Sequence, residues 1–248
     1  MKQDNADQRL SRISTLWSLV RVAHQGPSVA ANSARQQLLH RYGDAVRRYL
    51  SKLLRKPDAV DEVFQEFAVR LIRGDLCGAD PRRGRFRNFV KGTLFHLIAD
   101  YRKQQQHWPA PLPGDGAELA VNLPDADSDR SFAESWCDEL LARAWAALAE
   151  IEAGTGRSYH AVLRFRADHP EMRAPQLAEQ LTAQLGRPFT AAGVRQTLHR
   201  ARAKFAALLL EEVAHSVENP TTEQLTEELV ELGLLDYCRP ALQQRLRV

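Results

Sequence analysis

The side chains with the clearest capacity for chemistry are concentrated in residues 190–205, TAAGVRQTLHRARAKF. Arg195, Gln196 and His199 carry hydrogen-bond donors that can reach base edges in the major groove of DNA, and they fall in the first turns of a predicted helix. More basic residues follow them, and the stretch contains no acid. The pattern favours DNA binding. The alternative that it leaves open is an ordinary helical hairpin with a solvated basic face.

A second basic stretch comes earlier in the chain. Between Arg82 and Lys103 there are seven Lys and Arg residues and one acid, Asp100. These basic residues are interleaved with polar and aromatic ones, a combination that suits a phosphate backbone and unstacked bases. Taken alone, the stretch is explained equally well as a solvated cationic face.

Acidic and amide side chains gather on the predicted helix 58–73, at Asp61, Glu62, Gln65 and Glu66. The helix macrodipole favours acids near a helix N-terminus, and this alone could explain the first two. A pair of catalytic carboxylates is not indicated, because Asp61 and Glu62 are adjacent and point in different directions on a helix.

Other signatures of catalysis are missing from the sequence. The histidines are scattered, there is no glycine-rich phosphate-binding motif, and Cys77, Cys137 and Cys238 lack metal-ligand spacing. We therefore expect a protein that is not an enzyme and has no metal site and no cofactor. Reduced thiols, no apolar signal core and no membrane-length apolar run predict a cytoplasmic protein that does not associate with membranes.

The elements that would position the 190–205 side chains form a recognisable pattern. Val194, Leu198, Ala201, Phe205 and Leu208 recur at steps of three and four, so they make one apolar stripe of a helix that continues to about residue 214. Thr190 is a suitable N-cap for it. A short helix at 176–185 and a compact turn at 186–189 precede this helix, and together they predict a helix-turn-helix.

The whole chain favours an all-α fold, because Ala, Leu, Arg, Gln and Glu dominate and few residues suit long strands. The formal net charge of +3 hides an uneven distribution. Four prolines and two glycines interrupt residues 105–131, and positions 109–129 hold acids but no basic residue, so we predict a flexible, acidic, Pro-rich linker. The other predicted helices span 8–23, 33–55, 58–73, 86–105, 132–152 and 157–167.

The chain becomes acidic after the helix-turn-helix. A capping-box start at Thr221–Gln224, a leucine stripe and a stop at Gly233 predict an acidic amphipathic tail helix. The predicted organisation is an N-terminal helical domain at 1–104, the linker at 105–131, a helix-turn-helix domain at 132–214, and an acidic helical extension at 215–248.

Two of these segments, in this order, resemble a known family. DAVDEVFQEFAVRLI at 58–72, followed by FRNFVKGTLFHLIADYRK at 86–103, is similar to the second conserved region of bacterial RNA polymerase sigma factors. The 190–205 stretch is similar to the recognition helix of their C-terminal helix-turn-helix. The small extracytoplasmic-function (ECF) group, which has two helical domains and a linker, is the type that the chain most resembles, over residues 30–214.

The resemblance implies two partners, core RNA polymerase and promoter DNA, and leaves open an anti-sigma or other regulatory protein. It implies that the N-terminal domain melts the −10 promoter element, that the helix-turn-helix reads the −35 element, and that the linker follows polymerase channels normally occupied by RNA. The implied core-polymerase contacts are Asp61, Glu62, Gln65 and Glu66. The implied −10 contacts are Arg87, Asn88, Lys91, His96, Arg102 and Lys103, and the implied −35 contacts are Thr190, Arg195, Gln196, His199, Arg200, Arg202 and Lys204.

The chain also departs from the family pattern. The turn at 186–189, the insertion-like stretch 152–173, the helix at 8–23 and the tail from 215 onward are unusual for it. We expect the acidic tail either to cover the basic DNA-reading surface or to bind a regulator, or simply to extend the core of the last domain. The alternative to a sigma factor is a stand-alone helix-turn-helix regulator, although no dimer seam is evident in the sequence.

Overall fold

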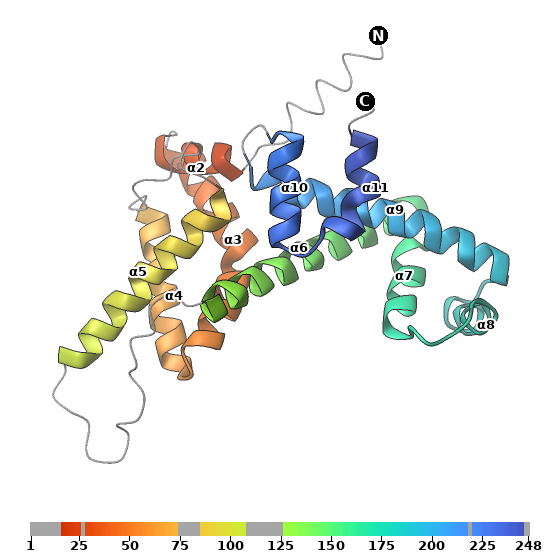
Figure 1. Ribbon diagram of the computed structural model, residues 1–248, viewed down its shortest axis with the longest axis horizontal. Coiled ribbons are helices and arrows are strands. Elements are labelled where there is room, and N and C mark those ends of the chain that lie inside the picture. Colours follow the sequence, from red (N-terminus) through yellow and green to blue (C-terminus); the bar gives the residue numbers. More distant parts are fainter. Residues whose placement is uncertain (1–15, 26–27, 74–84, 108–125, 218–219, 246–248) are drawn as a thin grey trace, which may run out of the picture. The chain divides into compact units, whose positions relative to one another are not determined.

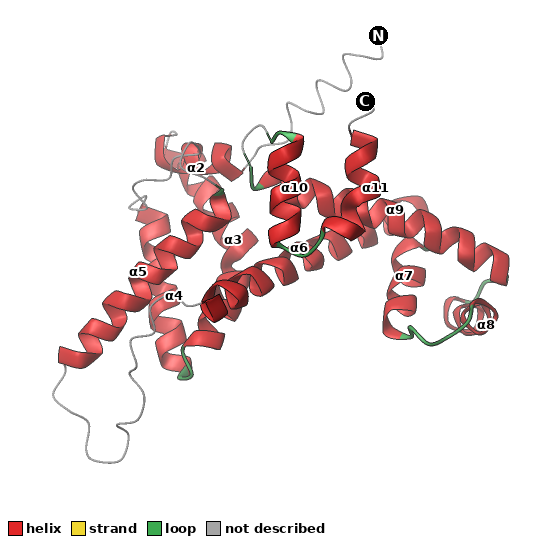
Figure 2. Ribbon diagram, viewed as in Figure 1, coloured by secondary structure: helices red, strands yellow, loops and turns green. Residues whose placement is uncertain are grey.

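A computed structural model describes residues 16–25, 28–73, 85–107, 126–217 and 220–245. Within these ranges the chain is helical, and no strand occurs (Figure 2). The all-α prediction is therefore confirmed. None of the described helices is long and apolar enough to cross a membrane.

The helices are shown in Figure 1. They are α2 (Leu16–Gln25), α3 (Ser28–Leu53), α4 (Pro57–Arg73), α5 (Phe86–His107), α6 (Ala126–Thr155), α7 (Tyr159–Asp168), α8 (Ala174–Leu185), α9 (Ala191–His215), α10 (Thr222–Glu231) and α11 (Leu235–Arg245).

The chain divides into two compact units. The first comprises residues 1–139 and 214–221, and in it α3 packs on α2 and α4, and α4 on α5. An aromatic cluster forms part of its core: Trp136 of α6 stacks on Tyr42 of α3 with ring centroids 4.6 Å apart, and Phe132 meets Tyr49 edge to face at 5.0 Å. The first half of α6 therefore completes the core built by the preceding helices.

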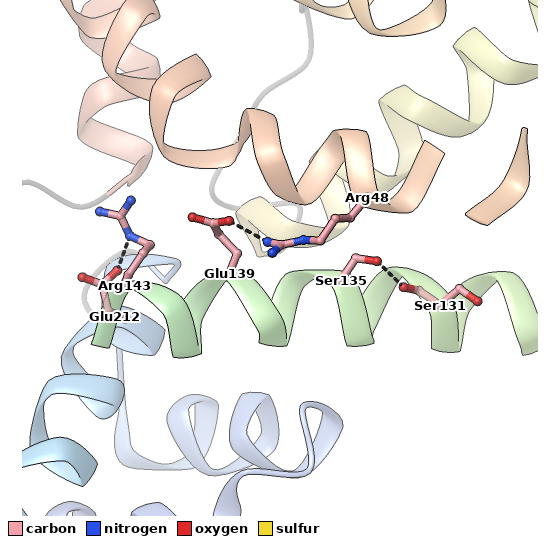
Figure 3. A network of polar contacts seen from close by, with 6 residues as sticks. All are labelled: Arg48, Ser131, Ser135, Glu139, Arg143 and Glu212. Atoms are coloured by element: carbon pink, nitrogen blue, oxygen red, sulfur yellow. Dashed lines mark hydrogen bonds and ion pairs between the residues drawn. The ribbon is translucent and has the colours of Figure 1, made fainter. Parts of the chain in front are cut away.

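Polar contacts fix the same half of α6 in this unit. Arg48 of α3 donates to the carboxylate of Glu139 at 2.6 Å, and the hydroxyls of Tyr49 and Ser128 lie 2.9 Å apart. Figure 3 shows Arg48 extended along α6 to reach Glu139. Glu139 is 9% exposed, so its charge is held in a largely desolvated place by a charged partner.

The second unit comprises residues 140–213 and 222–248. Apolar side chains of α6, α8 and α9, such as Leu148, Leu181 and Val194, are buried almost completely in it, and α7 packs on α8. Arg143 of α6 pairs with Glu212 of α9 at 3.0 Å (Figure 3). Leu225 and Leu229 of α10 are buried too, so the tail is a packed part of this unit.

The ends of the predicted linker differ from the prediction. Helix α5 continues to His107 and α6 begins at Ala126, so residues 105–107 and 126–131 are helical; residues 108–125 lie outside the described residues. Asp127 and Asp129, which the sequence analysis assigned to an acidic linker, occupy the first turn of α6, where acids complement the helix dipole. The compact units also divide between residues 139 and 140, inside α6, and not at the predicted boundary of 131.

The tail contains more structure than expected. The predicted tail helix is α10, and Gly233 ends it with φ of 68°, in the left-handed region that glycine favours. A further helix, α11, was missed; it contains Pro240, which lowers helix propensity. The predicted helix 8–23 is described from Leu16 and ends at Gln25; its first half lies outside the described residues.

Candidate nucleic-acid and protein interfaces

Helices α8 and α9 and their connection have the layout of a helix-turn-helix. Helix α8 ends at Leu185, and the cap residue Gly186 donates its N–H to the carbonyl of Thr182 at 3.1 Å. Gly186 has φ of 64°, in the left-handed region, which turns the chain away from the helix axis. The Thr182 hydroxyl oxygen in turn accepts the N–H of Phe189 at 2.9 Å. The turn is thus held by hydrogen bonds to the last turn of α8, and it delivers the chain to the start of α9.

Thr190 begins the second helix as predicted. Its hydroxyl oxygen accepts the N–H of Gly193 at 3.0 Å, and its carbonyl accepts the N–H of Val194 at 2.9 Å. Four members of the predicted apolar stripe are on the inside, with Val194 and Ala201 fully buried and Leu198 and Phe205 nearly so, whereas the fifth, Leu208, is half-buried. The stripe therefore fixes which face of α9 remains for a partner.

The predicted base-reading and phosphate residues of α9 are all exposed. At about 100° per residue, Gln196 lies opposite the buried stripe, His199 and Arg200 lie on either side of Gln196, and Arg195 lies at the edge of this exposed face. The acidic tail does not cover these residues, so the structure does not show the expected masking of the DNA-reading surface. The tail packs instead on the buried side of α9, where Tyr237 contacts Phe205. The exposed set is Thr190, Arg195, Gln196, His199, Arg200, Arg202 and Lys204.

Arg202 differs from the others in its surroundings. It lies next to the buried stripe and lines a pocket together with Tyr237 of α11. Burial raises the pKa of the Tyr237 hydroxyl, and the nearby Arg202 guanidinium partly opposes that rise. Arg202 is therefore less well placed than Gln196 or Arg200 for a duplex that approaches the solvent face.

The candidate residues of α5 are not equivalent. Arg87 is 5% exposed, so its predicted contact with DNA does not fit this structure. Its position, one residue after the buried Phe86, places it beside the core of α5 and not on the solvent side. Asn88, His96 and Lys103 are exposed, and Arg102 is half-buried.

Lys91 has an acidic partner within its own unit. Its ammonium group lies 3.1 Å from a carboxylate oxygen of Asp129 in the first turn of α6. The pair is partly exposed, so it is weak enough to exchange for another anion. Phe95 meets His96 edge to face at 5.9 Å, which gives α5 an aromatic surface beside its exposed basic residues.

The acidic candidates on α4 share one exposed face. Asp61, Glu62, Gln65 and Glu66 are all exposed, whereas Val63 and Phe67 on the opposite face are buried. Two of these acids have basic partners: Asp61 lies 2.6 Å from Arg47, and Glu66 lies 2.7 Å from Arg70.

Glu62 acts on a neighbouring helix through its charge. Burial raises the pKa of the Tyr101 hydroxyl on α5, and the carboxylates of Glu62 and Asp58 raise it further, because they disfavour a second negative charge. The side chain of Gln105 opposes this by a hydrogen bond. Tyr101 therefore stays protonated beside the acidic face.

Two apolar side chains that the sequence analysis did not suggest also belong to this face: Ile72 is 47% exposed, and Val69 is 37% exposed. Both follow Gln65 at helical spacing, so they extend the acidic face with an apolar patch near the end of α4. Helical spacing in the sequence could have indicated this exposure. Val69 and Ile72 fall on the same helix face as the polar residues, whereas Leu71 falls on the face of the buried ones.

The described residues contain no cluster of three or more His, Cys, Asp and Glu side chains that could hold a metal ion. Cys238 is buried, and burial together with Asp138 raises the pKa of the Cys137 thiol, which makes that thiol a poor nucleophile.

No family model, curated protein or solved structure matches the chain.

Proposed function

We propose that this chain is a promoter-specificity subunit of bacterial RNA polymerase, a sigma factor of the ECF type. It has no chemistry of its own in this proposal. Through α4 it binds core polymerase, through α5 it holds the −10 element, and through α9 it reads the −35 element. The residues between α5 and α6 form the linker of a two-domain protein.

One observation carries the proposal: the first half of α9, to Phe205, has an exposed face of donors without an acid, positioned by an N-cap and a tight turn. Arg195, Gln196 and His199 lie within its first turns, which is the part of a recognition helix that reaches base edges. The same chain places an exposed acidic face on α4, and opposite charges steer association with a basic partner.

The two proposed DNA-binding surfaces differ in the kind of nucleic acid that they suit. The face of α9 suits a duplex, because its donors project from one side of a regular helix. The surface of α5 has exposed Asn88, His96 and Lys103 beside Phe95, and bases that have left the stack can pack on aromatic rings. Arg87, which is buried, is not part of the proposed surface.

Binding of the purified chain to core polymerase, followed by run-off transcription from a promoter library, tests the proposal. Glu62→Lys is the most informative variant, because Asp61 and Glu66 already pair with arginines on the chain itself. We expect this variant to weaken polymerase binding at least tenfold while the helical content is unchanged. Glu223→Lys, which reverses an exposed acid on α10, is the matched control and should bind normally.

A second candidate is a stand-alone helix-turn-helix regulator, which the geometry of α8 and α9 also supports. The same experiment separates the two. A folded chain that binds duplex DNA but neither binds polymerase nor gives new start sites would be a regulator of this kind, and the sigma proposal would be wrong.

A further inference from the structure

A pocket with a volume of about 540 Å³ lies within the second unit. It is a partly open groove lined by α6, α7 and α9 and by the start of α11, and its size is in the range that holds small organic ligands. Because the groove is open to solvent on one side, a ligand can enter it without unfolding of the unit. Neither DNA reading nor polymerase binding requires it.

The wall of the pocket is mainly apolar and aromatic. Trp145 of α6 packs on Phe205 of α9 with ring centroids 4.6 Å apart, and Phe205 meets Tyr237 edge to face at 5.9 Å. Leu163 of α7 and Leu209 of α9 add aliphatic surface. A ligand that fills such a space gains free energy by removing its own apolar surface from water.

The polar groups of the pocket are of one sign. Among the described residues that line it there are two guanidinium groups, Arg166 and Arg202, and no carboxylate. Arg166 donates to the carbonyl of Met172, which holds its side chain in place. Arg202 is exposed and has no ion pair with any described residue, and the hydroxyl of Tyr237 is a further donor near it.

We propose that this pocket binds a monocarboxylate with an apolar body, of the class of medium-chain fatty acids. The apolar part lies against Trp145, Leu163 and Phe205, and the carboxylate is bound by Arg202. A guanidinium matches the geometry of a carboxylate with two parallel hydrogen bonds, which favours this head group over an uncharged one. This site is additional to the proposed function and does not depend on it.

Titration of the full chain with dodecanoate, followed by calorimetry and by thermal unfolding, tests this inference. We expect one binding site and a rise in Tm with ligand concentration. Dodecanol and acetate test the apolar wall and the guanidinium of the site separately. Dodecanol has the apolar body without the charge, and acetate has the charge without the apolar body. Each should bind at least tenfold more weakly than dodecanoate.

Two pairs of variants locate the binding. Ala167→Trp fills the pocket and should abolish binding, whereas Ala153→Trp adds the same side chain at an exposed position of α6 away from the pocket and should not. Arg202→Gln should weaken dodecanoate binding at least fivefold without affecting dodecanol, and Arg202→Lys should restore part of it. Thermal unfolding of each ligand-free variant shows that it is folded.

The inference is overturned by any of three results: no binding of dodecanoate by the folded wild-type chain, binding that Ala167→Trp leaves unchanged, or equal affinity for dodecanol. The second would place the ligand elsewhere on the surface, and the third would show an apolar cavity without selection for charge. Because the readout is ligand binding, failure here leaves the polymerase experiment unaffected, and failure there leaves this one unaffected.

Discussion

Trp136 stacks on Tyr42 with ring planes 4° apart and centroids separated by 4.6 Å. Trp136 belongs to α6 and Tyr42 to α3, and the two residues are 94 positions apart in the sequence (136 − 42 = 94). The stack makes the first half of α6 part of the core of the first unit. Phe132, one turn before Trp136, is buried as well, and α6 begins at Ala126, ahead of these core positions.

The first prediction concerns this stack. Trp136 is 1% exposed, so Trp136→Ala removes a large buried ring and should lower the free energy of unfolding by about 3–5 kcal/mol. Trp136→Phe should cost less, because it keeps a ring in the stack and removes an indole N–H that has no hydrogen-bond partner among the described residues. Urea unfolding followed by circular dichroism measures both. Equal losses for the two variants would contradict the stacking argument.

Two neighbouring arginines of α3 provide a second prediction. Arg47 and Arg48 each lie 2.6 Å from a carboxylate, but Asp61 is 57% exposed at its side chain and Glu139 is 11% exposed. Solvent screens the first pair, so Asp61→Asn should change stability by about 0–1 kcal/mol. Glu139→Gln leaves Arg48 without its charged partner and should cost about 1.5–3 kcal/mol.

The double variants control this comparison. Arg48→Met combined with Glu139→Gln should change the free energy of unfolding by an amount that differs from the sum of the two single changes. For Arg47→Met combined with Asp61→Asn, the change should be close to that sum. Arg47 also lies 3.9 Å from the ring of Phe64, so its replacement has a cost that is independent of Asp61. If the exposed pair proved the stronger of the two, burial would not be what sets their strength.

Most of the helices could be predicted from the sequence, because the spacing of apolar residues indicates which face of a helix is buried. Val194, Leu198, Ala201 and Phe205 are spaced so that only a helix can bury them together, and all four are buried. The N-cap at Thr190 and the stop at Gly233 depend on local hydrogen bonds and on φ, which are encoded within a few residues. Such features do not need the rest of the fold.

What the sequence did not reveal depends on distant contacts. The sequence shows Asp129 only as one acid of an acidic stretch, whereas the structure pairs it with Lys91. The sequence shows Arg87 only as one of several basic residues, whereas the structure buries it. Helix α11 was missed because Pro240 disfavours a helix locally, whereas Cys238 and Leu242 are buried by the rest of the unit. The pocket at Arg202 likewise joins side chains from four helices.

The third prediction compares two glycines that differ in backbone conformation. A Cβ added at Gly154 or at Gly186 would meet no atom within 4 Å, so neither substitution causes a clash. Gly186 has φ of 64° at the end of α8, and Gly186→Ala should therefore destabilise by about 1 kcal/mol. Gly154 lies in α6, and Gly154→Ala should stabilise by about 0.5–1 kcal/mol.

Thermal unfolding of the two variants tests the geometry of the turn between α8 and α9. The signs should be opposite, because one position requires a left-handed residue and the other a helical one. A stabilising effect at Gly186 would mean that the turn does not have the conformation on which the presentation of α9 depends.

The last prediction concerns the two kinds of contact that the exposed face of α9 makes under the proposed function. Arg195 lies in the first turns of the helix, and Lys204 lies more than two turns further on; both are exposed. If Arg195 binds a guanine edge, Arg195→Ala should cost about 1–3 kcal/mol at one position of the upstream element and little at the others. If Lys204 neutralises a phosphate, Lys204→Ala should weaken binding to every sequence alike and reduce the salt slope by about 1. Binding to a set of promoters with single base changes, at several salt concentrations, separates these outcomes, and a uniform loss for Arg195→Ala would make that residue a phosphate contact.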